Sequence, residues 1–244
     1  NSNDFTVNNL TSVDQATDTP TNNFCTLNPL NPTFTENIGA FLTEGNLKFQ
    51  PTSGDYCIAK ATIAFPKAGK WYFEVLLGPS GEGGINGMLG IIRNPGTQSS
   101  TNAALGNYCN DYCYYSEGQA ARTDIKKGSA SETLIAASLT VWANDDTLSM
   151  AFNADDNEVK WYLNGALEHT LDLSSAPDGF YANDGDWLPA VSMYDGYASR
   201  SFNFGSPSHS ISSGNADANG YGNFEYAPPS GYYALCTKNL AEFG

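Results

Sequence analysis

Acidic side chains crowd the run DDTLSMAFNADDNEVKWYLNG, from Asp145 to Gly165, which holds four aspartates and one glutamate. Carboxylates this close together are typical of calcium loops, of paired catalytic acids and of turns between strands. The run lacks the D-x-[DN]-x-[DN]-G spacing of a calcium helix-loop-helix. Whether the acids are catalytic or lie in turns therefore depends on the secondary structure that is predicted around them.

Apolar residues in this run alternate with polar or small ones, which is the period of a half-buried strand. They are Leu148, Met150 and Phe152, followed by Val159, Trp161 and Leu163. This pattern predicts strands at 147–153 and 158–163, each with one buried face. The Ala-Asp-Asp-Asn string at 154–157 is expected to be the turn between them, and Asn-Gly at 164–165 a second turn. The acids are thus predicted to mark turns.

Catalytic strings are missing elsewhere in the chain. Glu74 lies in the run WYFEV, but the E-x-D-x-E string of jelly-roll glycosidases is absent, and a glycosidase needs a second carboxylate within reach. A Ser-His-Asp triad needs an activated serine, yet there is no G-x-S-x-G string. His169 and His209 lie in polar surroundings and are expected to be surface histidines.

Oxygen ligands gather once more in the run DGFYANDGDW, which contains Asp178, Asp184 and Asp186. These side chains suit calcium, although turn chemistry explains the run equally well, so both interpretations stay open. The sequence indicates no other cofactor.

The five cysteines are an odd number and do not form a closed disulfide framework. Cys109 and Cys113 lie four residues apart in a polar run, where they either close a small ring or bind a metal. Cys25 and Cys236 lie in similar strings near opposite ends. They would approach each other if the termini pair as neighbouring strands, and reduced, buried thiols are the alternative.

The formal net charge of −15 argues against two classes of partner. An acidic surface repels phosphate backbones and anionic membranes, so no nucleic-acid partner is expected. No stretch approaches the ~20 apolar residues of a membrane-spanning helix, so no membrane insertion is expected.

Short strand-like runs separated by Gly, Pro, Asn and Asp clusters predict an all-β protein, an antiparallel β-sandwich or jelly roll. We expect residues 1–23 to form an N-terminal arm or linker and 24–244 a single domain with a mobile loop at 206–223. The predicted strands are 46–50, 57–65, 70–77, 88–93, 113–117, 138–143, 147–153, 158–163, 187–194, 199–204 and an extended stretch at 231–237.

Five segments, in order between residues 69 and 205, resemble the SPRY domain family. They are GKWYFEVLL, MLGIIR, YCYYSEGQ, the acidic run and DWLPAVSMYDGYASRSFNFG. The resemblance implies a bent β-sandwich that binds ligands and has no catalytic centre, with Glu74 as a structural residue. The flanking strings TDTPTNNFCTLNPL and NFEYAPPSGYYALCTKNL resemble the borders of SPRY-like modules in bacteriophage structural proteins, such as tail fibres.

SPRY domains often bind through loops at one edge, which correspond here to 78–86, 94–107 and 195–198. Exposed aromatic and charged side chains near these loops are the expected contacts: Tyr194, Asp195, Tyr197, Arg93, Tyr114 and Tyr115. The implied function is adhesion to a host-surface glycan or protein by a multi-copy virion or extracellular module. The alternatives are structural cement or a filament subunit that contacts neighbouring virion subunits, and a jelly-roll glycoside hydrolase.

Overall fold

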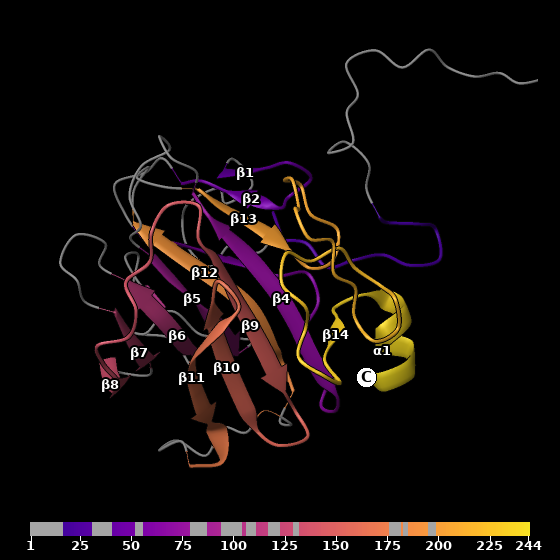
Figure 1. The fold of residues 1–244 in the computed structure, drawn as a ribbon. Coiled ribbons are helices and arrows are strands. Elements are labelled where there is room, and N and C mark those ends of the chain that lie inside the picture. Colours follow the sequence, from indigo (N-terminus) through magenta and orange to yellow (C-terminus); the bar gives the residue numbers. More distant parts are fainter. Residues whose placement is uncertain are drawn as a thin grey trace, which may run out of the picture.

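The structure is a computed structural model of the chain. It describes residues 17–30, 41–51, 56–78, 87–93, 104–105, 111–116, 123–128, 132–175, 182, 185–194 and 199–244. Two sheets, antiparallel except for one short parallel pair in the larger of them, lie face to face (Figure 1). The predicted all-β sandwich is therefore confirmed.

The larger sheet has the order β1-β2-β13-β4-β9-β10-β11, and β14 also pairs with β4. Its strands are β1 (Leu42–Thr43), β2 (Lys48–Phe49), β13 (Arg200–Asn203), β4 (Lys70–Leu77), β9 (Thr147–Asn153), β10 (Glu158–Leu163), β11 (Ala166–Asp172) and β14 (Tyr233–Ala234). The smaller sheet has the order β3-β12-β5-β6-β7-β8. Its strands are β3 (Tyr56–Lys60), β12 (Trp187–Tyr194), β5 (Gly87–Arg93), β6 (Asp111–Ser116), β7 (Thr123–Gly128) and β8 (Glu132–Ala136).

Two short helical elements complete the described chain, η4 (Leu173–Ser175) and α1 (Thr237–Phe243). No described helix is both long and apolar enough to cross a membrane. The strand predicted at 138–143 is wrong, because the chain between β8 and β9 is irregular there. Trp142 nevertheless anchors this connection, since its buried ring packs edge-to-face against Tyr114, with the ring centroids 5.1 Å apart.

The core between the sheets is rich in aromatic rings. Trp71, Phe73, Phe152 and Trp161 are fully buried in it, on β4, β9 and β10. The indole nitrogen of Trp161 donates to the carbonyl oxygen of Leu89 on β5, 3.3 Å away, which ties the two sheets together. A buried indole N–H needs such a partner, so the bond also fixes the orientation of the ring.

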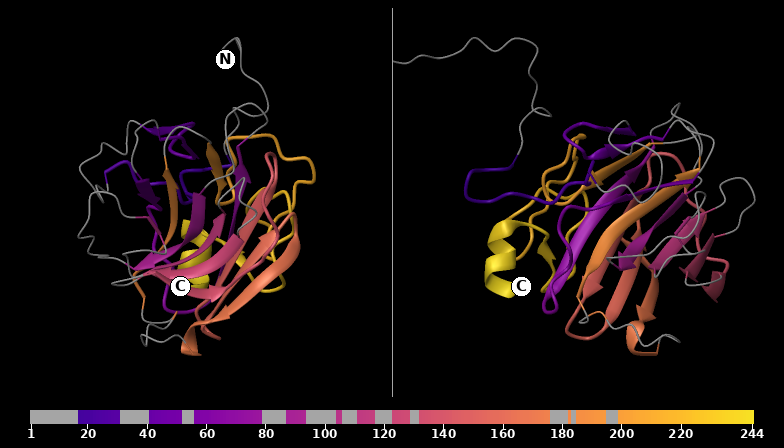
Figure 2. Two further views of the ribbon diagram at one scale, coloured as in Figure 1. Left: turned by 90° about the vertical axis from the view of Figure 1, so that its left-hand side faces the viewer. Right: turned by 180° about the vertical axis from the view of Figure 1, so that it is seen from behind.

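A C-terminal segment, residues 206–244, covers the other face of the larger sheet. In Figure 1 this segment, drawn in yellow, lies to the right of β4. In the right-hand panel of Figure 2, which is seen from behind, it lies at the left. A second apolar cluster forms beneath it, in which Tyr72 and Ala151 of the sheet contact Phe224 and Tyr232 of the segment. Every residue of β9 is consequently buried. The predicted one-faced burial therefore holds for β10, which alternates, and not for β9.

The stretch 206–223, expected to be a mobile loop, is packed and hydrogen-bonded in the structure. Asn215 pairs with Phe224 across a β-bridge, and Ser212 and Ser213 bond to Glu225. Its Gly and Asn residues serve tight turns; Gly220 has φ of +77°. A glycine-rich segment can therefore also be a folded one, and the mobility of 206–223 stays a prediction.

The described end of the N-terminal arm also packs. Thr17 bonds to Gly205 and Ser206, and Phe24 pairs with Cys236 across an antiparallel bridge. These two segments therefore pair, and of the two alternatives for Cys25 and Cys236 the structure has the reduced, buried thiols. The register explains this. Cys25 lies opposite Leu235 and belongs to the inter-sheet core, whereas Cys236 belongs to the outer cluster.

Candidate functional site

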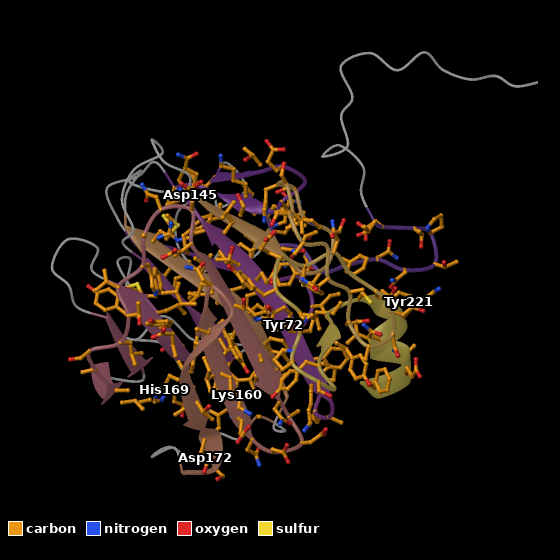
Figure 3. All side chains as sticks on the ribbon, viewed as in Figure 1. Tyr72, Asp145, Lys160, His169, Asp172 and Tyr221 are labelled. Carbon is orange, nitrogen blue, oxygen red and sulfur yellow. The ribbon has the colours of Figure 1, made fainter. Side chains whose placement is uncertain are left out.

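The acidic run lies where turns were predicted. Residues 154–157 form the turn between β9 and β10, and Asn164 and Gly165 both have positive φ, as a type I′ turn requires. Asp145 and Asp172 lie at opposite ends of the sheet in Figure 3. Among the described residues, no group of three or more His, Cys, Asp or Glu side chains could hold a metal ion. These acids organise turns.

Glu74 is a buried structural carboxylate, as the resemblance implied. Its two oxygens accept hydrogen bonds from the Tyr72 hydroxyl, the Asn203 amide and the backbone N–H groups of Glu225 and Tyr226. Burial raises its pKa to about 7, against the effect of these four donors. Its described hydrogen-bond partners include no second carboxylate, and it binds the C-terminal segment to β4.

The structure describes only some of the predicted ligand contacts, and two of those lie far apart along one strand pair. Arg93, the last residue of β5, lies opposite Trp187 at the start of β12, whereas Tyr194 is at the end of β12. Seven residues of extended strand separate these ends by about 23 Å. Most of the predicted binding loops, 78–86, 94–107 and 195–198, lie outside the described residues. Asp195, Tyr197 and the Tyr194 side chain lie outside the described residues.

Tyr114 and Tyr115 are buried, which corrects the expectation of exposed rings. Tyr114 is in the inter-sheet core and donates to the carbonyl oxygen of Thr140, 2.9 Å away. Tyr115 faces the outer side of the smaller sheet, where it lies opposite Met88 and belongs to an apolar cluster that includes Leu105. Alternation along β6 sends the two rings to opposite faces, and both faces are covered there.

The remaining predicted sites have mixed outcomes. Asp186 is an exposed residue with φ of +63°, which is turn geometry, and Asp178 and Asp184 lie outside the described residues. Cys109 lies outside them too, so its pairing with Cys113 stays a prediction, while Cys113 itself is buried. His169 is half-buried. His209 is half-buried too, so neither is a fully exposed histidine, and burial lowers the pKa of both.

A groove that the sequence did not predict lies between the start of β4 and the C-terminal segment. It encloses about 320 Å³, within the size range of small-ligand sites. We call it the Tyr233 groove. Its lining residues are Ala68, Gly69, Lys70, Asp155, Ser230, Gly231, Tyr233 and Phe243.

Local turns shape both walls of the Tyr233 groove. On the sheet side, the Asp155 carboxylate accepts the N–H of Gly69 at 2.8 Å, which joins the β9–β10 turn to the start of β4. On the other side, the N–H of Tyr232 donates to the Pro229 carbonyl across a turn whose third residue, Gly231, has φ of +79°. That position favours glycine, as in a type II turn.

The groove combines an aromatic pair with charged and polar groups. The rings of Tyr233 and Phe243 stack with their centroids 4.0 Å apart and an interplanar angle of 7°. Lys70 forms a 2.9 Å ion pair with Asp156, and that hydrogen bond raises the pKa of Lys70. Aromatic carbon beside hydroxyl, carboxylate and ammonium groups suits a ligand that has both apolar faces and hydroxyl groups.

Sequence reasoning missed this site for a definable reason. Tyr233 lies in the stretch that was predicted to be extended, and β14 occupies part of it. Phe243 is in α1, a helix of seven residues whose N-cap residue, Cys236, makes no side-chain capping bond. A helix this short and uncapped leaves almost no periodic signal.

These features define an all-β sandwich domain with a C-terminal segment and a ligand-sized groove between the two. No protein-family model matches the chain, and no curated protein sequence matches it. Solved structures similar to it include the SPRY domain of human HERC1 (12% identity, TM-score 0.46, 64% of this chain and 87% of that chain). The TRIM65 PSpry domain is similar as well (12% identity, TM-score 0.48, 74% of this chain and 92% of that chain).

A carbohydrate-binding module, CBM66 from Bacillus subtilis, is a further structure with some similarity (13% identity, TM-score 0.39, 64% of this chain and 81% of that chain). All of these TM-scores are below 0.5. The likenesses therefore carry no conclusion about function, which has to come from the groove itself.

Proposed function

We propose that this chain is a non-enzymatic binding module that holds a glycan in the Tyr233 groove. The observation that carries the proposal is the stacked Tyr233–Phe243 pair beside Lys70 and Asp155 in a cavity of about 320 Å³. A sugar ring offers C–H groups to an aromatic ring and hydroxyl groups to charged side chains. A groove of this size suits a terminal sugar better than the broad surface of a protein partner.

The proposed setting is the surface of a phage-type particle or of a cell. There, many weak sites acting together give high avidity without any change in the individual site. The edge residues Tyr194, Asp195 and Tyr197 remain a predicted second surface. A purely structural role, as cement between neighbouring subunits, is the outcome to expect if the groove binds no glycan.

Replacing Tyr233 by alanine is expected to weaken glycan binding about tenfold, since loss of one aromatic contact is worth on the order of 1 kcal/mol. The measurement is a glycan array, followed by calorimetric titration with free chitotriose, maltotriose and 3′-sialyllactose. Tyr226→Ala is the matched control, because Tyr226 is half-buried on the same segment and does not line this groove.

Equal loss in Tyr233→Ala and Tyr226→Ala would point to general damage to the segment. No binding of any glycan by the folded wild type would rule out the proposed function.

A further inference from the structure

The aromatic wall of the Tyr233 groove lies outside the two-sheet sandwich. Tyr233 comes from β14, which pairs in parallel with Trp71 and Tyr72 of β4, beyond the end of β13. Phe243 is the last residue of α1. Two backbone positions therefore have to be held at once, one in a two-residue strand and one in a short helix.

A single carboxylate holds both elements. One oxygen of Asp217 accepts the N–H of Ala234 in β14 at 2.9 Å and the side-chain amide of Asn239 in α1 at 2.7 Å. The same amide nitrogen donates to the Ala234 carbonyl at 2.9 Å, which closes the connection between strand and helix. Asp217 is 7% exposed and Asn239 is fully buried, so these bonds form away from solvent.

The other oxygen of Asp217 fixes the turn that carries it. It accepts the N–H groups of Asn219 and Tyr221, each at 2.9 Å. Asn219 then donates from its side chain to Asn239 at 3.0 Å, which is a second link from this turn to α1. All four bonds to the carboxylate come from N–H donors, and their loss would leave buried or partly buried N–H groups without partners.

We propose that Asp217 is the positioning residue of the Tyr233 groove, which sets ligand affinity by holding Tyr233 and Phe243 in their stacked arrangement. This inference rests on the proposed function for its ligand and on the described contacts for its mechanism. Asp217 does not line the groove, so it acts on the ligand through β14 and α1.

Asp217→Asn is a sharp test because the two side chains have the same shape. Each carboxylate oxygen accepts two N–H donors, so either orientation of the asparagine amide turns an NH₂ group toward two donors. We expect amide hydrogen exchange within residues 231–243 to accelerate about tenfold or more, while amides of β9 and β10 keep their protection. The dissociation constant of the best of the three free oligosaccharides is expected to rise about tenfold.

Two further variants complete the experiment. Asp186→Asn removes the same charge from an exposed turn residue and should leave both readouts unchanged. Asn239→Ala removes the link to α1 while Asp217 keeps the Ala234 N–H, and it should accelerate exchange in 237–243 most. It keeps the test informative if Asp217→Asn does not fold.

Each outcome decides one part of the inference. Unchanged exchange in 231–243 for Asp217→Asn would overturn the positioning role. Faster exchange in 231–243 with an unchanged dissociation constant would show that Asp217 holds β14 and α1 without affecting ligand affinity. That result would overturn the claim that Asp217 sets affinity. If wild type binds none of the three oligosaccharides, the proposed function fails, and exchange in the ligand-free protein still decides whether Asp217 positions the wall.

Discussion

Gly90→Ala is expected to destabilise the sandwich by on the order of 3 kcal/mol or more, enough to prevent folding of a marginally stable domain. Gly90 lies in the middle of β5, between Cys113 of β6 and Ala190 of β12. A Cβ atom there would lie 1.9 Å from the carbonyl oxygen of Tyr112 and 2.7 Å from the Cα of Cys113. Both obstacles are backbone atoms, so relief requires β5 and β6 to separate and lose ladder hydrogen bonds.

Gly220→Ala is the matched control for this substitution. Gly220 has φ of +77°, and an added Cβ would meet nothing within 4 Å. Alanine there should cost only the penalty for left-handed backbone, about 1–2 kcal/mol. Urea denaturation followed by circular dichroism measures both variants. If Gly90→Ala were as stable as Gly220→Ala, the pairing of β5 with β6 at Gly90 would be incorrect.

Local patterns predicted the strands and turns well because period-two alternation and turn chemistry depend on neighbouring residues. The turns at 154–157 and 164–165 and strands β4, β9 and β10 are examples. The burial of both faces of β9 was beyond local reasoning. It depends on contacts of Ala151 with residues more than seventy positions away, in the C-terminal segment.

Candidate site residues were harder to predict because antiparallel register decides which strand ends meet. Arg93 and Tyr194 lie close to loops in the sequence, yet the pairing of β5 with β12 puts them at opposite ends. Asp217 presented the reverse problem. Its run, GNADANGYGN, has the composition of a loose loop, and its partners Ala234 and Asn239 lie 17 and 22 residues further along the chain.

Lowering the pH from 7.5 to 5 is expected to stabilise the wild type relative to Glu74→Gln. Burial raises the folded-state pKa of Glu74 from 4.5 to about 7, so the folded protein binds more protons than the unfolded chain between those values. The contribution of Glu74 to stability is therefore present at low pH and is lost as the pH rises through 7. This difference between the two pKa values corresponds to a change of about 3 kcal/mol in the free energy of unfolding between pH 4.5 and 7.

Other titrating groups in the segment require a matched comparison. Burial lowers the pKa of His209, so its contribution has the opposite sign and is lost as the pH falls below 6.5. Hydrogen bonds from Ser212 lower the pKa of Glu225, so Glu225 changes the pH dependence of stability only below pH 4.5. Urea denaturation at pH 5 and 7.5 should therefore compare wild type with Glu74→Gln, and both again in a His209→Gln background. Glu158→Gln supplies the same charge change at a half-exposed position.

Glu74→Gln is also expected to be less stable than wild type at either pH, by about 1–3 kcal/mol. The glutamine NH₂ fits best at the oxygen that faces Tyr72, because the hydroxyl of Tyr72 can turn to accept it. The N–H of Tyr226, which donates to that same oxygen, then has no acceptor. If the advantage of the wild type over Glu74→Gln instead grew from pH 5 to 7.5, the four donors would outweigh burial. Glu74 would then be a permanent anion that binds the C-terminal segment to β4 at every physiological pH.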